Sequence, residues 1–517
     1  MALPICGIRR GQMYVVSIKT ITMFYYVICI FMFFSIMGSL SAESTASFPA
    51  QKLIIGFTAT PNPKPTTFQP ILFDSSRNFS LGFLRVNQDQ LALAIVHVPS
   101  GESFWQPNSV GLAQWGKHTQ LFFNGSLVFT DPKSGVFWSS NNSDGDHVVL
   151  TSATNLQILN GNSNSIVWQS FDFPSDTLVE NQNFTSAMSL ISSNGLYTMR
   201  LGFDFIGLYA KFKPDGSGSD QIYFKHGALQ AKAQIVPGHG PIVVRISSDG
   251  FMGMYQNSSV PADVNSFNSY QRTVPGPRRV RIESDGNLKG YYWSGSSWNL
   301  DYVAIPEPCE LPSPCGPYGL CTPGAGCSCL DNQTQTQAQA QTKSHKCPGS
   351  RYESEPGDLC SKVNNKYREL RRTGVELPYK ELMMYTKTES YESCQKSCVE
   401  NCSCWGALYN NASGFCYYVD YPIQSILGVG DEAKLGYFKV WEGVEKKRER
   451  WVGIGVGLLC GSIFILLGVL SLACFKLCKR NSRKNDGFLE HEDIACSTPY
   501  KDLGSSSFGS IELSNNK

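Results

Sequence analysis

Cysteine is missing from the long stretch between Glu43 and Pro306 of this 517-residue chain. Charged residues are also few, at 17%, and the formal net charge is only +2. Without cysteines, a disulfide framework is excluded for that stretch, so hydrophobic cores must hold it together. The small net charge argues against a polyanionic partner such as nucleic acid.

Catalytic motifs are missing as well. The chain has neither a G-x-S-x-G nor an H-E-x-x-H motif, and no two histidines have the spacing of a metal site. The seven histidines are scattered, at His97, His118, His147, His226, His239, His345 and His491. The sequence therefore predicts no catalytic residue, no metal site and no cofactor.

An apolar run near the N-terminus, from Ile21 to Met37, follows several basic residues and precedes small residues that end at Ala42. This order is typical of a secretory signal peptide, which we place at residues 1–42. A retained signal anchor is the alternative interpretation of the same pattern.

A second apolar run, from Trp451 to Phe475, holds no charged residue. It exceeds the roughly 20 residues that a helix needs to cross a bilayer, so we expect one transmembrane helix at 451–475. Both flanks are basic, so the positive-inside rule does not give the orientation of this helix. The predicted signal peptide gives it, because the residues that follow a signal peptide are exported. It predicts a single-pass type I protein of the plasma membrane, with residues 43–450 outside and a cytoplasmic tail at 476–517.

Twelve cysteines cluster between Cys309 and Cys416. An even, clustered number on the oxidising side of a membrane predicts six disulfides, although spacing alone leaves the connectivity open. The densest stretch, CQKSCVENCSC from Cys394 to Cys404, lacks the spacings of zinc sites and the C-x-x-C of redox sites. A structural role is therefore favoured over metal or redox chemistry.

Sequons of the type Asn-x-Ser/Thr fall only in the predicted extracellular part. We expect glycosylation at Asn78, Asn124, Asn141, Asn183, Asn257, Asn332 and Asn411. An eighth sequon begins at Asn401, but its middle residue is Cys402, and a disulfide there would disfavour a glycan.

Short β-branched apolar runs alternate with turn residues from Gln51 to Val303, for example KLIIGF, LALAIVHV and RRVRI. Runs of this length and spacing predict an all-β region. Its size, without disulfides, requires hydrophobic cores, and we expect two.

A longer motif points to a family. WQSFDFPSDTL, from Trp168 to Leu178, resembles the W-Q-S-F-D-x-P-T-D-T-L signature of plant S-locus glycoproteins and S-domain receptor-like kinases. NFSLGFL and VFWSSN resemble neighbouring strands of that family, and the resemblance covers residues 50–441. It implies a mainly β chain with a bulb-type (G-type) lectin β-prism at 43–180, a second, S-locus glycoprotein-like prism at 181–305, a small disulfide-rich EGF-like module at 306–348 and an α+β PAN/apple module at 349–445.

The same resemblance implies a disulfide pattern, since CGPYGLC is similar to the family's EGF-like module and ESCQKSCVENCSCWGALY to its PAN module. The implied pairs are Cys309–Cys321, Cys315–Cys327, Cys329–Cys347, Cys394–Cys416, Cys398–Cys404 and, as the remaining pair, Cys360–Cys402.

The lectin family's sugar motif is Q-x-D-x-N-x-V-x-Y, in which every second side chain of a strand points to one face. The best match is ESDGNLKGY. It keeps Asp285, Asn287 and Tyr291, the candidate carbohydrate-binding residues, but has Glu283 and Lys289 at the Gln and Val positions. The competing interpretation is an ordinary S-D-G-N turn before a strand, because these residue types suit turns.

In the first predicted prism the motif is largely lost. Around FFNGSLVFT only Val128 survives, and around TSATNLQIL only Asn155. A mannose pocket is therefore less expected there than at ESDGNLKGY.

The resembled receptors end in a kinase domain, but the 42 residues after Phe475 hold no glycine-rich phosphate loop, no H-R-D and no D-F-G. The chain resembles the kinase-lacking, PAN-containing relatives, so we expect no enzyme. We expect a cell-surface receptor-like glycoprotein that binds a carbohydrate, peptide or protein partner, as a homodimer or with a receptor kinase that signals for it. The alternative is an adhesion or scaffold protein that dimerises or contacts cell-wall polysaccharide.

Overall fold

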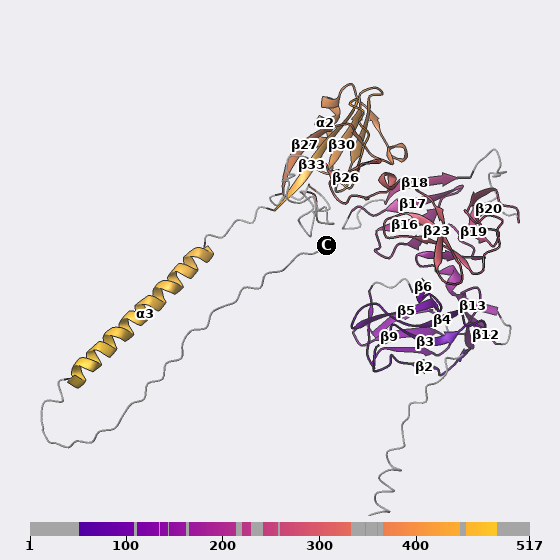
Figure 1. The fold of residues 1–517 in the computed structure, drawn as a ribbon, viewed down its shortest axis with the longest axis horizontal. Coiled ribbons are helices and arrows are strands. Elements are labelled where there is room, and N and C mark those ends of the chain that lie inside the picture. The colour runs from indigo at the N-terminus through magenta and orange to yellow at the C-terminus, as the bar shows by residue number, and fades with distance from the viewer. Residues whose placement is uncertain are drawn as a thin grey trace, which may run out of the picture. The chain divides into compact units, whose positions relative to one another are not determined.

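In the computed structural model the chain divides into two compact units, Met1–Val444 and Glu445–Lys517. Strands dominate the first unit, and one long helix lies in the described part of the second (Figure 1). The expectation of a mainly β chain is confirmed. The residues that the structure describes are 51–107, 111–133, 135–142, 144–161, 165–213, 220–228, 241–256, 259–331, 347, 359, 365–444 and 451–482.

Three antiparallel sheets form the N-terminal domain of the first unit. They are β3-β4-β5-β6 with β7 beside β5, β10-β9-β8-β2, and β1-β11-β12-β13. The strands are β1 Leu53–Ile54, β2 Thr58–Ala59, β3 Phe68–Phe73, β4 Phe79–Arg85, β5 Gln90–His97, β6 Glu102–Trp105, β7 Ala113–Gln114, β8 Gln120–Phe123, β9 Leu127–Asp131, β10 Gly135–Ser139, β11 His147–Leu150, β12 Leu156–Asn160 and β13 Ser165–Gln169.

One hydrophobic core serves this domain, and strand alternation explains its composition. In β4 the side chains of Leu81 and Phe83 are fully buried, and Ile95 and Leu93 lie opposite them in β5. Because successive strand residues point to opposite faces, each sheet turns one apolar face inward. Burying each such side chain contributes roughly 2 kcal/mol before chain entropy is subtracted.

The WQSFDFPSDTL segment carries the chain out of the third sheet. Gln169 ends β13, and η1, Ser170–Asp172, is a short 3-10 helix. The Asn155 side chain donates to Gln169 Oε1 at 2.8 Å, and Trp105 Nε1 donates to the Phe173 carbonyl at 2.7 Å. These bonds pair polar groups where the strand ladder stops, which a buried chain segment requires.

The second domain also has three antiparallel sheets: β14-β22-β23-β24, β15-β16-β17-β18 and β19-β20-β21. Its core continues into the modules that follow, because buried side chains from Leu178 to Trp441 form one cluster. The strands are β14 Thr177–Val179, β15 Leu190–Ile191, β16 Tyr197–Leu201, β17 Phe205–Ala210, β18 Gln221–Gly227, β19 Val243–Ser247, β20 Phe251–Tyr255, β21 Asp263–Ser266, β22 Arg278–Ile282, β23 Leu288–Trp293 and β24 Trp298–Val303.

The cysteine-rich part contains two sheets, β26-β25-β32-β28 and β27-β33-β30-β31-β29. In the first of them β25 pairs in parallel with β32, so the segments expected to form separate EGF-like and PAN modules share a sheet. The elements are η2 Pro308–Glu310, β25 Gly319–Thr322, β26 Gly326–Cys329, β27 Asn365–Thr373, β28 Val375–Glu376, η4 Lys380–Leu382, β29 Thr386–Lys387, α2 Tyr391–Glu400, β30 Gly406–Asn410, β31 Phe415–Val419, β32 Ile426–Gly428 and β33 Lys434–Val444.

Helix α2 is fixed at both ends. Ser390 caps its N-terminus by accepting the Ser393 amide. At the other end Lys439 of β33, only 1% exposed, donates to the carbonyls of Cys398 and Asn401 at 2.9 and 3.0 Å. A lysine that binds these carbonyls satisfies acceptors that a helix leaves unpaired at its C-terminal end.

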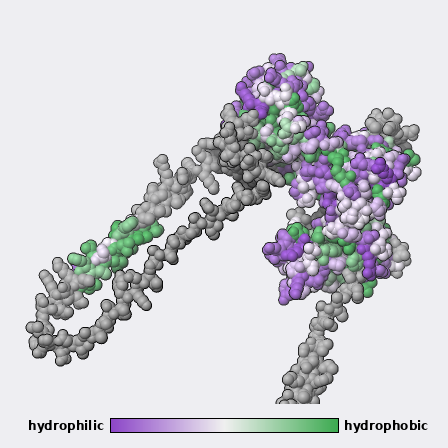
Figure 2. Space-filling model, in the orientation of Figure 1, coloured by the Kyte–Doolittle hydropathy of each residue, from purple (hydrophilic) through white to green (hydrophobic). Residues whose placement is uncertain are grey.

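The described part of the second unit is helix α3, Trp451–Ser482. Its side chains are described at Leu459 and from Gly461 to Leu477, and the large apolar ones are exposed, as the green surface in Figure 2 shows. Within the described residues, no helix is both long and apolar enough to span a membrane. The transmembrane helix expected at 451–475 stays a prediction. The expected signal peptide and residues 483–517 of the tail lie outside the described residues.

Candidate functional site

The predicted carbohydrate-binding residues lie at and just before β23. Asp285 Oδ1 accepts the Asn287 amide at 2.8 Å, which closes a turn. The Asn287 side chain, 3% exposed, donates to the Ile305 carbonyl at 2.8 Å and accepts the Ile305 amide at 3.1 Å. Both ends of its amide are used inside the domain, so Asn287 ties the start of β23 to the chain after β24. This geometry fits the turn interpretation.

The other two candidates also have partners on the protein. The Tyr291 hydroxyl donates to Glu283 Oε1 at 2.7 Å, and Lys289 Nζ lies 2.9 Å from Asp285 Oδ2. Burial, and then the hydrogen bond to Glu283, raise the pKa of Tyr291, so the hydroxyl stays protonated. Glu283 and Lys289 are the two departures from the family motif, and each holds one of the kept residues. Sugar binding at this turn stays a prediction.

The remaining motif positions of the first domain are structural. Val128 is 8% exposed and Asn155 6%. Besides its bond to Gln169, Asn155 Oδ1 accepts the Ser170 hydroxyl at 3.3 Å. These two positions therefore offer no exposed polar group to a ligand.

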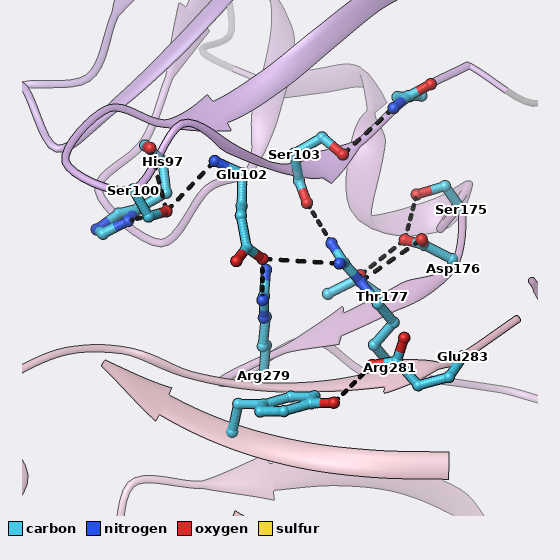
Figure 3. A network of polar contacts seen from close by, with 12 residues as sticks. His97, Ser100, Glu102, Ser103, Ser175, Asp176, Thr177, Arg279, Arg281 and Glu283 are labelled. Carbon is cyan, nitrogen blue, oxygen red and sulfur yellow. Dashed lines mark hydrogen bonds and ion pairs between the residues drawn. The ribbon is translucent and has the colours of Figure 1, made fainter. Parts of the chain in front are cut away.

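A polar network that reaches the predicted site at Glu283 and Tyr291 joins the two three-sheet domains, and we call it the interdomain joint (Figure 3). It is built on β22, whose sequence RRVRI carries three arginines. Arg278 alternates with Val280 and Ile282, which are buried in the core of the second domain. Arg279 and Arg281 point to the opposite face of the strand, where they meet residues of the first domain.

Glu102, the first residue of β6, is the acidic centre of this interdomain joint. It pairs with Arg279 and lies 3.7 Å from Arg281 Nη1. Arg281 Nη2 also donates to the Ser103 carbonyl at 2.5 Å, and its Nε lies 3.5 Å from Asp176 Oδ2. The arginine side chains are 3% and 18% exposed, so the charges interact in a partly water-free environment that strengthens them.

Aromatic rings surround the Arg279 guanidinium. Its Cζ lies 4.1 Å from the ring centroid of Trp298, 5.1 Å from that of Phe104 and 5.5 Å from that of Tyr291. Its Nε and Nη1 are buried and have no hydrogen-bond partner among the described residues. Attraction between the cation and the ring faces compensates part of that desolvation.

His97, the last residue of β5, packs in the same joint. It is 2% exposed, and its ring centroid lies 4.9 Å from that of Trp293 and 5.4 Å from that of Trp298, both in the second domain. Burial, and then the charge of Arg279, lower the pKa of His97 to about 4, against a smaller opposite effect of Glu102. The imidazole is therefore neutral at neutral pH.

His97 and Ser100 have the spacing of a base and a nucleophile, since Nδ1 lies 2.9 Å from Ser100 Oγ. A general base works best when its pKa is near the working pH. A buried imidazole with a pKa of about 4 takes up a proton poorly at neutral pH, so the pair is unsuited to nucleophilic catalysis. The joint holds the domains together.

Sequence reasoning missed this joint, although a signal was present. Three arginines within five residues of a strand that has neighbours on both sides need counter-charges or hydrogen bonds when the strand is buried. The pattern could have shown that β22 carries an interface, but not which acid it meets.

The cysteines form the disulfides Cys309–Cys321, Cys315–Cys327, Cys329–Cys347, Cys394–Cys416 and Cys398–Cys404, which are pairs that the family resemblance implies. Cys402 is also disulfide-bonded, while its implied partner Cys360 lies outside the described residues. The sulfurs of Cys315, Cys321 and Cys327 lie within 4.8 Å of one another, but each is in a disulfide and cannot bind a metal as a thiolate.

Five of the expected glycosylation sites are exposed: Asn78, Asn124, Asn141, Asn183 and Asn411. Asn257 and Asn332 lie outside the described residues. Asn401 is exposed too, but its Oδ1 accepts the Ser403 amide and hydroxyl at 3.0 and 2.8 Å, and the disulfide of Cys402 constrains the sequon.

Comparison with known proteins assigns the class first. A family model described as D-mannose binding lectin matches residues 102–198. Among solved structures, a Marasmius oreades lectin is 18% identical, with a TM-score of 0.18, 25% of this chain covered and 89% of that chain. The two-domain Scilla campanulata agglutinin is 14% identical, with a TM-score of 0.18, 49% of this chain covered and 93% of that chain. The family-model match by itself assigns a lectin-type domain to residues 102–198 of this mainly β chain.

Proteins of similar sequence narrow the assignment from this class to a family. A PAN domain-containing protein of Arabidopsis thaliana is 50% identical over 466 residues, which cover 90% of this chain and 93% of that protein. The G-type lectin S-receptor-like serine/threonine-protein kinase SD2-5 of the same plant is 26% identical and covers 84% of this chain. The chain spans only 54% of that kinase's length. The chain belongs to the family of PAN domain-containing, S-domain lectin receptor-like proteins.

Proposed function

We propose that this chain is a non-catalytic, single-pass cell-surface glycoprotein that binds a carbohydrate through its lectin-type domains. The observation that carries the proposal is the D-mannose binding lectin match at residues 102–198, within a chain that is 50% identical to a PAN domain-containing relative. Recognition of hydroxyl groups needs preformed polar groups on a rigid scaffold, and sheets that pack on one core supply such a scaffold.

The extracellular part of this proposal has chemical support. The disulfides lie in the predicted ectodomain, where oxidising conditions favour them. The exposed sequons lie in the same part, and the Asn124 and Asn411 side chains are accessible to a glycan-adding enzyme. We place the membrane crossing at residues 451–475, because that stretch of α3 lacks charge and its described apolar side chains are exposed.

Signalling, in this proposal, depends on a separate protein. The relatives named S-receptor-like kinases match this chain over about half their length. The chain would supply only a ligand-binding ectodomain, and a receptor kinase in the same membrane would supply phosphoryl transfer. The C-terminal module, which carries exposed Met384 and Tyr385, would offer a surface for a peptide or protein partner.

The carbohydrate part is tested on the full-length chain in detergent micelles. Immobilised manno-, gluco-, galacto- and xylo-oligosaccharides are compared with the anionic oligogalacturonate, and we expect at least one neutral oligosaccharide to bind saturably. A folded, glycosylated chain that binds none of them would refute the carbohydrate-binding function.

Extracellular placement is tested separately in plant cells. Asn124→Gln and Asn411→Gln should each remove one glycan, seen as a step in apparent mass that disappears after glycosidase treatment. If the chain shows no glycosidase-sensitive mass at all, the cell-surface topology is wrong.

A further inference from the structure

A polar cavity of about 530 Å³ opens in the second domain and shares no lining residue with the ESDGNLKGY turn. Its walls come from distant parts of the sequence: Glu180 after β14, Asp249 in the β19–β20 turn, and the loop from Tyr270 to Gly276 before β22. Arg278, the first residue of β22, completes them. A volume of roughly 300–1,000 Å³ is typical of small-molecule sites.

Arg278 organises the cavity from within the domain. Its side chain is 3% exposed, and its Nη1 donates to the Ser248 carbonyl at 2.5 Å while its Nη2 donates to the Arg272 carbonyl at 3.0 Å. One buried arginine thus fixes two of the loops that form the walls. Its Nε is buried without a hydrogen-bond partner among the described residues, and the Asp301 carboxylate is 4.0 Å away. The ion pairs with Asp301 and Glu180 hold this guanidinium in place beneath the cavity.

The charges of the cavity balance. Glu180 and Asp249 are acidic, while Arg272 and Arg278 are basic. Glu180 accepts the Arg278 backbone amide at 3.2 Å, and its side chain is 23% exposed. Because the lining has no net charge but carries donors and acceptors close together, it favours a neutral ligand with many hydroxyl groups over an anion or a cation.

The rim carries an aromatic side chain. Tyr270 is 42% exposed, and its ring and that of Phe251 pack in an edge-to-face arrangement with the centroids 6.1 Å apart. An exposed ring held in this way can stack on the C–H face of a sugar. The next residue, Gln271, has a φ of 59°, which is strained for a non-glycine residue, and its amide donates to the Asp249 carbonyl at 2.7 Å. That bond keeps Tyr270 and Asp249 on the same rim.

We propose that this cavity binds a neutral oligosaccharide: Tyr270 stacks on one sugar ring, and Asp249, Gln271 and Arg272 exchange hydrogen bonds with its hydroxyl groups. The ligand class rests on the proposed function, but the location does not, because it follows from the cavity, its balanced charge and the exposed ring. The site is distinct from the turn that carries Asp285 and Asn287.

The test uses the full-length chain and the neutral oligosaccharide that binds tightest in the panel above. Tyr270→Ala and Asp249→Ala change exposed side chains and should each weaken binding at least tenfold, without a shift of the thermal unfolding midpoint. The matched control is Tyr385→Ala, which changes an exposed tyrosine of the C-terminal module and should bind as the unmodified chain does. Asp285→Ala is measured in parallel and reports on the motif turn.

The possible outcomes distinguish the proposed cavity site from the proposed carbohydrate-binding function. If the unmodified chain binds but Tyr270→Ala and Asp249→Ala bind equally well, the cavity is not the site, and the lectin function stands. If Asp285→Ala alone abolishes binding, the ligand sits at the motif turn. If only oligogalacturonate binds and the cavity variants weaken it, the assignment to a neutral ligand is wrong. If nothing binds the unmodified chain, the proposed function and this site are both refuted.

Discussion

His97 is the residue whose ionisation is most directly tied to the interdomain joint. Its ring belongs to the first domain but packs on Trp293 and Trp298 of the second. A charge on that ring would be desolvated and would lie near Arg279. Neutrality of His97 is therefore a condition for the close packing of the two domains.

Acid should weaken the folded chain through His97. The folded pKa of about 4 is below the ordinary value of 6.5, so the unfolded chain takes up a proton that the folded chain does not. The stability that neutral His97 gives the folded chain is fully present above pH 6.5. The free energy of unfolding falls as the pH drops towards 4, by at most about 3 kcal/mol. We expect the urea midpoint of the full-length chain to fall over this range, and to fall less in His97→Gln. The exposed His118→Gln should keep the unmodified slope; an equal slope in His97→Gln would contradict the assignment.

At the scale of single residues, the sequence predicted which residues form the motif turn but not the partners that they contact. Asp285, Asn287 and Tyr291 could be found from a motif, because the motif describes neighbours within one strand and its turn. Their internal hydrogen bonds could not be found, since Ile305 comes from a different strand end. Arg279 and Glu102 are 177 residues apart, and no local pattern fixes which acid a buried arginine meets.

At the scale of elements, α2 is held by polar and covalent bonds more than by an apolar face. Its buried residues are Cys394, Gln395 and Cys398. Lys439 binds the carbonyls at its C-terminal end, and burial lowers the pKa of that lysine, against an opposing effect of Glu369. Pairing with carbonyls keeps the buried cation tolerable.

Removing the Lys439 ammonium should therefore loosen the last turn of α2. In Lys439→Met the Cys398 and Asn401 carbonyls lose their donor, which should cost about 1–3 kcal/mol in the free energy of unfolding. Amide hydrogen exchange should accelerate at the C-terminal turn of α2. Lys396→Met, an exposed lysine on the same helix, is the control and should change neither quantity. An unchanged exchange rate in Lys439→Met would show that the lysine is dispensable.

The two disulfides of α2 should contribute unequally to the stability of the folded chain. Cys394–Cys416 closes a separation of 22 residues and Cys398–Cys404 only 6. Chain entropy alone gives about 3 kcal/mol for the longer loop and about 2 kcal/mol for the shorter one. We expect the double variant Cys394→Ala, Cys416→Ala to have a lower thermal midpoint than Cys398→Ala, Cys404→Ala. The reverse order would mean that native-state packing outweighs loop closure here.

The strands were predictable because period-two patterns are local. The disulfide pairs came from the family resemblance, since cysteine spacing alone leaves the connectivity open. The shared sheet of β25 and β32 was not predictable, since their residues Leu320 and Ile426 come from segments assigned to different modules. The oligosaccharide cavity was not visible either, because loops contribute its walls and loop conformation follows from the whole domain.

At the scale of the whole molecule, the first unit relies on the interdomain joint to fix its two three-sheet domains. Glu102 is the shared partner of Arg279 and Arg281. Removing its charge would leave a buried arginine among aromatic rings without a carboxylate partner. The joint therefore links the positions of the lectin-type domain and of the proposed cavity domain.

Glu102→Gln should lower the free energy of unfolding by about 1–2 kcal/mol. Loss of a fully buried ion pair would cost more, but the Glu102 side chain is 42% exposed. We expect a lower thermal midpoint and faster hydrogen exchange in both β6 and β22. Glu400→Gln removes an exposed acid that lies 3.9 Å from Lys396 and should change the midpoint little. Faster exchange in β6 alone would show that the domains are held elsewhere.

The pairing of β27 with β33 has a mechanical consequence. The chain enters the C-terminal sheet at Asn365 and leaves it at Val444, and these two residues are direct partners in an antiparallel ladder. Force on these two chain ends would load the ladder from one end, one residue pair after another, rather than all pairs at once. The pairing of β25 with β32, and the core that runs from the second domain to Trp441, would share that load, so the C-terminal sheet would resist it together with the domain before it.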